Sequence, residues 1–169
     1  MTPSAYRTGL DEAPRTLLLG GVWQAAGDAG AIPVHAPSEG RVFAQIAAGT
    51  VVDVDAAVAA ARHAFAEGDW GRLTAAERGR LLQALGRAVE ADAERLAQLE
   101  SLDTGKPLSQ ARADMAATAR YFEYYGAAAD KLHGETIPFL DGYTVMTVRE
   151  PHGVTGHVIP WNYPAQMFG

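Results

Sequence analysis

The 169-residue sequence contains no cysteine. This absence excludes a disulfide framework, a thiolate metal site and a thiol nucleophile within the chain. The sequence also lacks an apolar run of about 18 residues, which is the length that a membrane-spanning helix needs. We therefore expect no membrane partner, and the cytoplasm is the expected compartment.

Basic residues are also scarce. Lysine and arginine number 14 against 20 aspartates and glutamates, which gives a formal net charge of −6. Nucleic-acid-binding surfaces gather Lys and Arg into a patch, and the sequence shows no run of them, so no nucleic-acid partner is expected. With 48% hydrophobic and 20% charged residues the composition is typical of a globular chain, and the length suits one domain.

The amino-terminal part of the sequence is typical of β-hairpins. Two apolar runs flank Gly20-Gly21, which indicates a tight turn between two strands. Two further strand-like segments, at about 32–34 and 42–46, are separated by the turn-forming residues Pro37-Ser38-Glu39-Gly40. We expect strands on both sides of each turn.

Helical patterns follow from about residue 53. Asp53 is expected to cap a first helix, which Gly68 ends. A capping box, Thr74-Ala75-Ala76-Glu77, starts a second helix that Asp92 interrupts and Gly105-Lys106-Pro107 ends.

A third helix is expected from Ser109 to about Leu132. Apolar residues at helical spacing predict the buried face of each helix. These positions are Val54, Val58, Ala61 and Phe65 in the first helix, Leu81, Leu82, Leu85, Val89, Leu96 and Leu99 in the second, and Met115, Thr118, Phe122, Tyr125, Ala129 and Leu132 in the third.

The pattern changes to β at Gly134. Two β-rich runs, 136–140 and 143–149, are joined by Asp141-Gly142, which predicts a hairpin with a type I′ turn. Pro138 restricts the first run to a sheet edge. Residues 154–159 are expected to form another strand, and Pro164 suits the first turn of a helix after it.

Thr104-Gly105-Lys106 superficially resembles a phosphate-binding loop. That loop needs Gly five residues before the Gly-Lys glycine and Ser or Thr after the Lys. Glu100 and Pro107 occupy these positions, so the segment is interpreted as a helix end.

The segment Pro160-Trp161-Asn162-Tyr163-Pro164 is the strongest candidate site. In α/β sheets, ligands bind just beyond the carboxyl ends of strands. The two prolines stiffen the loop, and the Asn162 amide can donate hydrogen bonds to a developing oxyanion without titrating. Spacing alone leaves an ordinary strand-to-helix turn as the alternative.

Residues 154–164, Val154-Thr155-Gly156-His157-Val158-Ile159-Pro160-Trp161-Asn162-Tyr163-Pro164, resemble the hallmark segment of the aldehyde dehydrogenase superfamily. Other segments match in the same order. They are Leu102-Asp103-Thr104-Gly105-Lys106-Pro107-Leu108, Tyr121-Phe122-Glu123-Tyr124-Tyr125-Gly126, Gly134-Glu135-Thr136-Ile137-Pro138 and Arg149-Glu150-Pro151-His152-Gly153-Val154. The resemblance runs from about Leu17 to Gly169.

The resemblance implies an α/β fold class: the amino-terminal part of the aldehyde dehydrogenase fold, with a Rossmann-like dinucleotide domain and a protruding β-hairpin oligomerisation arm. Residues 1–132 would then be the hairpin and helical part of the cofactor-binding domain. Residues 133–151 would be the oligomerisation arm, and 152–169 the first Rossmann-like strand and the Trp-Asn loop of an incomplete chain.

The family resemblance also implies an activity: the NAD(P)⁺-dependent oxidation of an aldehyde to a carboxylic acid through a thiohemiacetal and a thioester. By this likeness Asn162 is the catalytic oxyanion-hole donor and, with Ile159, Pro160 and Trp161, contacts NAD or NADP. Tyr163 and Met167 match positions that line the substrate tunnel.

The resemblance further implies partners and a cation. Val34 and Asp114 match positions that bind a monovalent cation in some members. The implied partners are an aldehyde substrate and further copies of the chain, in a homodimer or homotetramer formed through the arm.

The chain lacks the cysteine nucleophile and the activating glutamate of the family, so we expect it to be inactive alone and to be part of a longer enzyme. The alternative is a non-catalytic, truncated binding or assembly module.

Overall fold

Two antiparallel hairpins open the described part of the chain, which in this computed structural model comprises residues 16–26 and 30–169. Strand β1 (Thr16–Leu19) pairs with β2 (Val22–Ala25), and β3 (Ala31–Ala36) pairs with β4 (Arg41–Ala47). Gly20 and Gly21 have φ of 59° and 81°, the positive values that a tight hairpin turn needs. The strands expected on both sides of each turn are confirmed.

Helices then form most of the molecule. They are α1 (Val51–Glu67), α2 (Ala75–Ala91), α3 (Ala93–Thr104) and α4 (Leu108–Ala128), with the 3₁₀ turns η2 (Asp69–Arg72) and η3 (Ala129–Lys131). The predicted capping box of Thr74 and Glu77 and the break at Asp92 are confirmed. In the described ranges, no helix combines the length and apolar character that crossing a bilayer requires.

The start of α1 differs from the prediction. Thr50, not Asp53, is the N-cap: its hydroxyl accepts a hydrogen bond from the Asp53 N–H at 3.3 Å. The Asp53 carboxylate in turn accepts the Thr50 N–H at 2.7 Å. Asp53 therefore closes a capping box from the third helical position, a role more often filled by Glu or Gln.

The core is small and lies where α3 meets α4. Ala97, Ala111 and Met115 form a buried cluster, against which Leu96, Leu108 and Ala165 pack. The predicted stripe on α4 is confirmed at Met115, Thr118 and Phe122, which are at most 8% exposed. It is wrong at Tyr125 and Leu132, which are 59% and 76% exposed.

The predicted buried face of α1 is also wrong, since none of its described residues is buried. Val54 and Phe65 are 59% and 51% exposed, and on α2 Leu81 is 51% exposed. Helix α1 therefore carries the apolar periodicity of a buried face without a buried residue. In the second predicted stripe, Leu82, Val89, Leu96 and Leu99 are half-buried.

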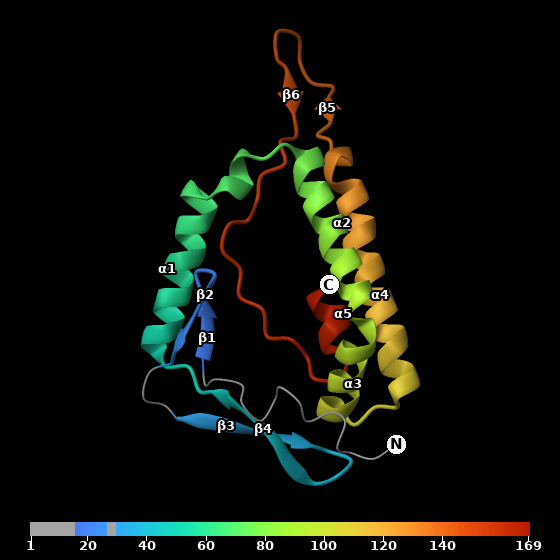
Figure 1. Cartoon of the computed structure of the whole chain (residues 1–169). Helices are drawn as coiled ribbons and strands as arrows, with labels where there is room; N and C mark the ends of the chain where they lie inside the picture. Colours follow the sequence, from blue (N-terminus) through green and yellow to red (C-terminus); the bar gives the residue numbers. More distant parts are fainter. Residues whose placement is uncertain (1–15, 27–29) are drawn as a thin grey trace.

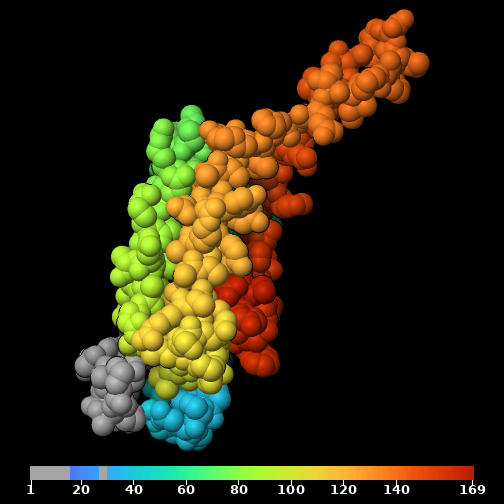
Figure 2. Space-filling view, turned by 90° about the vertical axis from the view of Figure 1, so that its right-hand side faces the viewer, coloured from blue at the N-terminus to red at the C-terminus, as the bar shows by residue number. Residues whose placement is uncertain are grey.

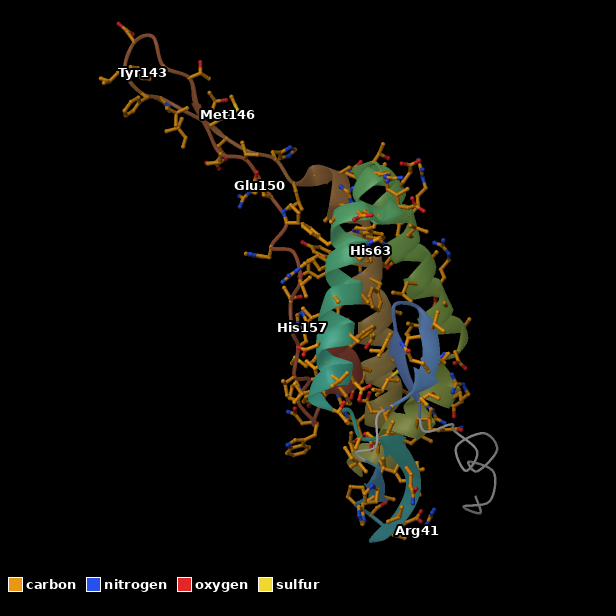
Figure 3. All side chains as sticks on the ribbon, turned by 90° about the vertical axis from the view of Figure 1, so that its left-hand side faces the viewer. Arg41, His63, Tyr143, Met146, Glu150 and His157 are labelled. Atoms are coloured by element: carbon orange, nitrogen blue, oxygen red, sulfur yellow. The ribbon has the colours of Figure 1, made fainter. Side chains whose placement is uncertain are left out.

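A β-hairpin arm projects from the end of the helical body (Figure 2). Strands β5 (Thr136–Ile137) and β6 (Val145–Met146) pair antiparallel, and Figure 3 places Tyr143 and Met146 well out along the arm. Pairing stops at Ile137 because Pro138 cannot donate to the ladder. The type I′ turn is wrong: Gly142 has φ of 80°, but Asp141 has no positive φ, a pattern typical of a type II turn.

The chain then returns along one side of the helical body, where it passes between α1 and the α2–α4 pair in the view of Figure 1. The strand predicted at 154–159 is wrong for the described structure, because this segment pairs with no described strand. A strand persists only where a neighbour satisfies its backbone groups. The helix predicted at Pro164 is confirmed as α5 (Pro164–Phe168), which packs on α4 through Phe168 against Phe122 with ring centroids 6.0 Å apart.

Helices α2 and α4 approach closely through glycine. A Cβ built on Gly79 would lie 2.3 Å from the Gly126 carbonyl oxygen, a distance that forces the two backbones apart. Gly126 is equally confined, with Gly79 O at 2.7 Å from its own added Cβ. The close packing of α2 on α4 therefore requires glycine at both positions.

We predict that Gly79→Ala destabilises the chain by about 2 kcal/mol or more, because the overpacking cost exceeds the ~1 kcal/mol gain in helix propensity. Gly71→Ala is the matched control, since its Cβ meets its nearest atom at 3.9 Å. Urea denaturation of both variants tests this, and equal stability for the two would contradict it.

Candidate active site

The turn after α3 fixes the backbone of Lys106. Gly105 ends the helix with φ of 75°, and the Ser101 hydroxyl donates to the Lys106 carbonyl at 2.7 Å. The Lys106 N–H donates to Thr104 Oγ1 at 3.3 Å. A Cβ on Gly105 would lie 3.3 Å from Pro37 of the β3–β4 turn, so both φ and space favour glycine here.

The side chain of Lys106 lies between two buried carboxylates. Its Nζ is 2.5 Å from Glu100 Oε1 and 2.6 Å from Asp114 Oδ2. The three side chains are 11%, 4% and 0% exposed for Lys106, Glu100 and Asp114. We call these three residues the Lys106 cluster.

Two glutamines complete the hydrogen bonding of Asp114. Its Oδ1 accepts from Gln110 Nε2 at 3.0 Å and from Gln166 Nε2 at 2.6 Å. Throughout the described residues, every buried side-chain nitrogen and oxygen has a hydrogen-bond partner. The cluster is thus a satisfied ionic centre that joins α3, α4 and α5.

The contacts within the cluster set its protonation. Burial alone would raise the pKa of Asp114, but hydrogen bonds from Lys106, Gln110 and Gln166 outweigh it and hold this pKa below its ordinary value. Burial likewise opposes the charge on Lys106, yet hydrogen bonds to Asp114 and Glu100 raise its pKa. Lysine and aspartate are therefore both ionised at neutral pH.

The candidate loop lies directly on this cluster. The Lys106 Nζ is 4.6 Å from the centroid of the Tyr163 ring, a cation–π contact. The neighbouring Asn162 is exposed, and its side chain makes no hydrogen bond to the described residues. Trp161 is 81% exposed. The amide and the indole are therefore both exposed on a loop that the contact between Tyr163 and Lys106 holds to the cluster.

The other predicted site residues are also accessible. Ile159 is 38% exposed and Met167 57% exposed, and Pro160 lies on the extended segment before the loop. Figure 3 shows the same extended segment at His157. Residues 159–163 and Met167 are therefore neighbours in sequence on one exposed stretch of chain.

The two residues expected to bind a monovalent cation have other surroundings. Asp114 is fully buried and accepts hydrogen bonds from the Lys106 ammonium and two amides, whereas Val34 is half-buried in β3, opposite Ala44. The Lys106 ammonium supplies the positive charge at Asp114, and the cation site stays a prediction.

Sequence reasoning missed Glu100, Lys106 and Gln166. The sequence pattern indicates only a helix end at Lys106, and Glu100 stands out only where a phosphate loop would need glycine. A usable signal was present, because a lysine immediately after a helix-ending glycine can reach back along the preceding helix.

Comparison with known proteins decides the family. The sequence model described as "Aldehyde dehydrogenase family" matches residues 23–169. The chain belongs to the aldehyde dehydrogenase family. A mitochondrial aldehyde dehydrogenase, family 2 member B4, of Arabidopsis thaliana is 44% identical over 153 residues, and human retinal dehydrogenase 2 is 44% identical over 148. These matches cover 90% and 86% of this chain but only 28% and 29% of the relatives.

Solved aldehyde dehydrogenases share the fold. A crystal structure from Burkholderia cenocepacia assigned to this enzyme class is 60% identical with a TM-score of 0.85, covering 89% of this chain and 32% of that one. The NAD⁺ complex of an aldehyde dehydrogenase from Bacillus cereus is 36% identical with a TM-score of 0.88, covering 99% and 34%. The predicted fold class, the amino-terminal part of the α/β aldehyde dehydrogenase fold, is confirmed.

We predict that Lys106→Met destabilises the chain by about 3–5 kcal/mol, because it leaves two buried carboxylates without a cation. Lys131→Met is the control, since that lysine is an exposed partner of Asp130 and surface pairs contribute little. Chemical denaturation of both variants measures the difference. A Lys106→Met chain as stable as the control would contradict the account.

Acid should weaken the fold through Asp114. Its folded-state pKa lies below the unfolded value of about 3.9, so its stabilisation is complete above that value and is lost as the pH falls through the folded pKa. Asp114→Asn should therefore flatten the acid-side loss of stability.

Asp103→Asn provides the opposite control for this pH dependence. Burial raises the pKa of Asp103, so its protonation favours the folded state and its removal should steepen the acid-side loss. Denaturation midpoints between pH 7 and pH 3 separate the two variants; the same pH slope for both would contradict the assignment.

Proposed function

We propose that this chain supplies the oxyanion-binding amide and part of the dinucleotide site of an NAD(P)⁺-dependent aldehyde dehydrogenase. The observation that carries the proposal is the Asn162 side chain, exposed on a loop that a buried ionic cluster holds in place. The Asn162 Nδ2–H groups would donate to the aldehyde oxygen as it gains negative charge.

The cofactor would lie along the extended segment before the loop. Ile159 and Trp161 are 38% and 81% exposed, and Pro160 is exposed as well, so a ligand can reach all three. Related enzymes have been solved with NAD⁺, including a betaine aldehyde dehydrogenase from Staphylococcus aureus. When bound, NAD or NADP would accept the hydride.

The side chains after Asn162 would line the aldehyde path. Tyr163 directly precedes α5, and Met167 lies within it. Met167 is 57% exposed. Tyr163 would have two functions, because its ring also contacts the Lys106 ammonium. We therefore propose that substrate contact and loop anchoring meet in this residue.

We also propose the division at 132/133 and 151/152, with residues 133–151 as an oligomerisation arm. Five of its large apolar side chains are 60–70% exposed: Phe139, Leu140, Tyr143, Met146 and Val148. Such a surface suits strand addition in a homodimer or homotetramer. Two relatives are mitochondrial by name, and a cytoplasmic location for this chain stays a prediction.

The cysteine-free sequence favours a second candidate. A chain without a thiol can bind a dinucleotide or assemble with another polypeptide, but cannot form the thiohemiacetal itself. The two candidate functions make different predictions for a chimera. Only the first predicts that residues 23–169 support dehydrogenase activity when they are joined to the remaining part of a related enzyme.

A chimera tests the proposal. Residues 23–169 replace the matching segment of the 60% identical Burkholderia cenocepacia relative. We predict that the chimera is active and that Asn162→Ala slows aldehyde-dependent NADH formation by about 10²–10³-fold while NAD⁺ affinity is retained. Stopped-flow rates and NAD⁺ titration measure the two effects.

Gln98→Ala is the control for loss of an amide, because Gln98 bonds Glu94 on α3. Equal losses of rate and NAD⁺ affinity in Asn162→Ala would show that Asn162 is structural. An inactive chimera would favour the non-catalytic module.

A further inference from the structure

We propose that Gln166 is a positioning residue that fixes the orientation of Asn162 by tying α5 to the Lys106 cluster. The inference rests on the proposed function, because it assigns a purpose to the Asn162 amide. It concerns Gln166, which sequence reasoning missed and whose side chain forms its hydrogen bonds with Tyr121 and Asp114, not with the cofactor segment or Asn162.

The hydrogen bond from Gln166 spans a long stretch of sequence. Its Nε2 donates to Asp114 Oδ1 at 2.6 Å, although the two residues are 52 positions apart. The acceptor is a fully buried carboxylate, and hydrogen bonds to charged groups are roughly twice as strong as neutral ones. On its other side, Gln166 Oε1 accepts from the Tyr121 hydroxyl at 3.3 Å.

A second contact holds the loop at its other end. The ring of Tyr163, one residue after Asn162, lies over the Lys106 ammonium at 4.6 Å. Pro164 stands between the two anchored residues and restricts both its own φ and the conformation of Tyr163. The segment 163–166 is therefore attached at both ends to one ionic centre, and Asn162 extends directly from it.

The helix itself cannot supply this rigidity. α5 has five residues, far fewer than the ~12–15 that an isolated helix needs to be stable in water. Its Met167 and Gly169 amides donate to Tyr163 O and Ala165 O at 3.0 and 3.1 Å. Those two hydrogen bonds should open more readily if the tie to Asp114 is lost and only the packing of Ala165 and Phe168 holds α5 on α4.

Gln110 provides a matched control. It donates an amide hydrogen bond to the same oxygen, Asp114 Oδ1, at 3.0 Å. Gln110 is an exposed residue of α4, and its side chain donates to Asp114 without a hydrogen bond to the loop. Gln166→Leu and Gln110→Leu therefore remove the same type of bond from the same carboxylate, and only the first removes a hydrogen bond that holds the loop segment.

Hydrogen exchange in the 169-residue chain tests whether Gln166 anchors α5 to the Lys106 cluster. Gln166→Leu should speed exchange of the Met167 and Gly169 amides by about tenfold, while Gln110→Leu leaves them unchanged. Equal exchange in the two variants, or none faster than in the parent chain, would overturn the proposal.

Kinetic measurements on the chimera test whether Gln166 orients the Asn162 amide for the reaction. Gln166→Leu should lower kcat for aldehyde oxidation about tenfold with the KM for NAD⁺ retained, and Gln110→Leu should not. Combined with Asn162→Ala, Gln166→Leu should cause no further loss, because the amide that it orients is gone.

The outcomes separate the two hypotheses. Losses that multiply in the double variant would overturn the positioning role and leave the proposed function intact. If Asn162→Ala has no effect on the rate, the proposed function fails, and hydrogen exchange then decides whether Gln166 still anchors the loop.

Discussion

A lysine ammonium held between two buried carboxylates organises this structure. Glu100, Lys106 and Asp114 are removed from water almost completely, and such charges are tolerated only where every donor and acceptor is matched. Gln110 and Gln166 satisfy the remaining oxygen of Asp114. Because the cluster takes one member from α3, one from the turn after it and one from α4, its geometry fixes how the end of α3 meets α4.

Contacts with that cluster fix the position of the exposed loop. Tyr163 and Gln166 both contact it, whereas Asn162 and Trp161 project outward. A flexible amide would lose conformational entropy on meeting a transition state, and a held amide does not. Along one short segment, Tyr163 and Gln166 thus contact the cluster, and Trp161 and Asn162 are exposed.

Local signals in the sequence predicted the local structure. The Gly20-Gly21 turn, the Thr74 capping box, the Asp92 break and Pro164 at the start of α5 all depend on nearby residues. Predictions that depend on distant partners were wrong: the strand at 154–159 has no described neighbour, and the apolar face of α1 remains uncovered. Likewise, the loop was predictable as a candidate site. Of the ionic cluster beneath it, only the contact of Lys106 with the nearby Glu100 has a local signal, because Asp114 meets Lys106 through the packing of α4 on α3.

The environment of the Lys106 ammonium is the most direct test of the account, and NMR of the 169-residue chain can measure it. The account predicts Lys106 Hε protons shifted upfield by the Tyr163 ring, and ammonium protons that exchange slowly with water because two carboxylates hold them. Hε shifts and ammonium exchange equal to those of a solvated lysine would contradict it.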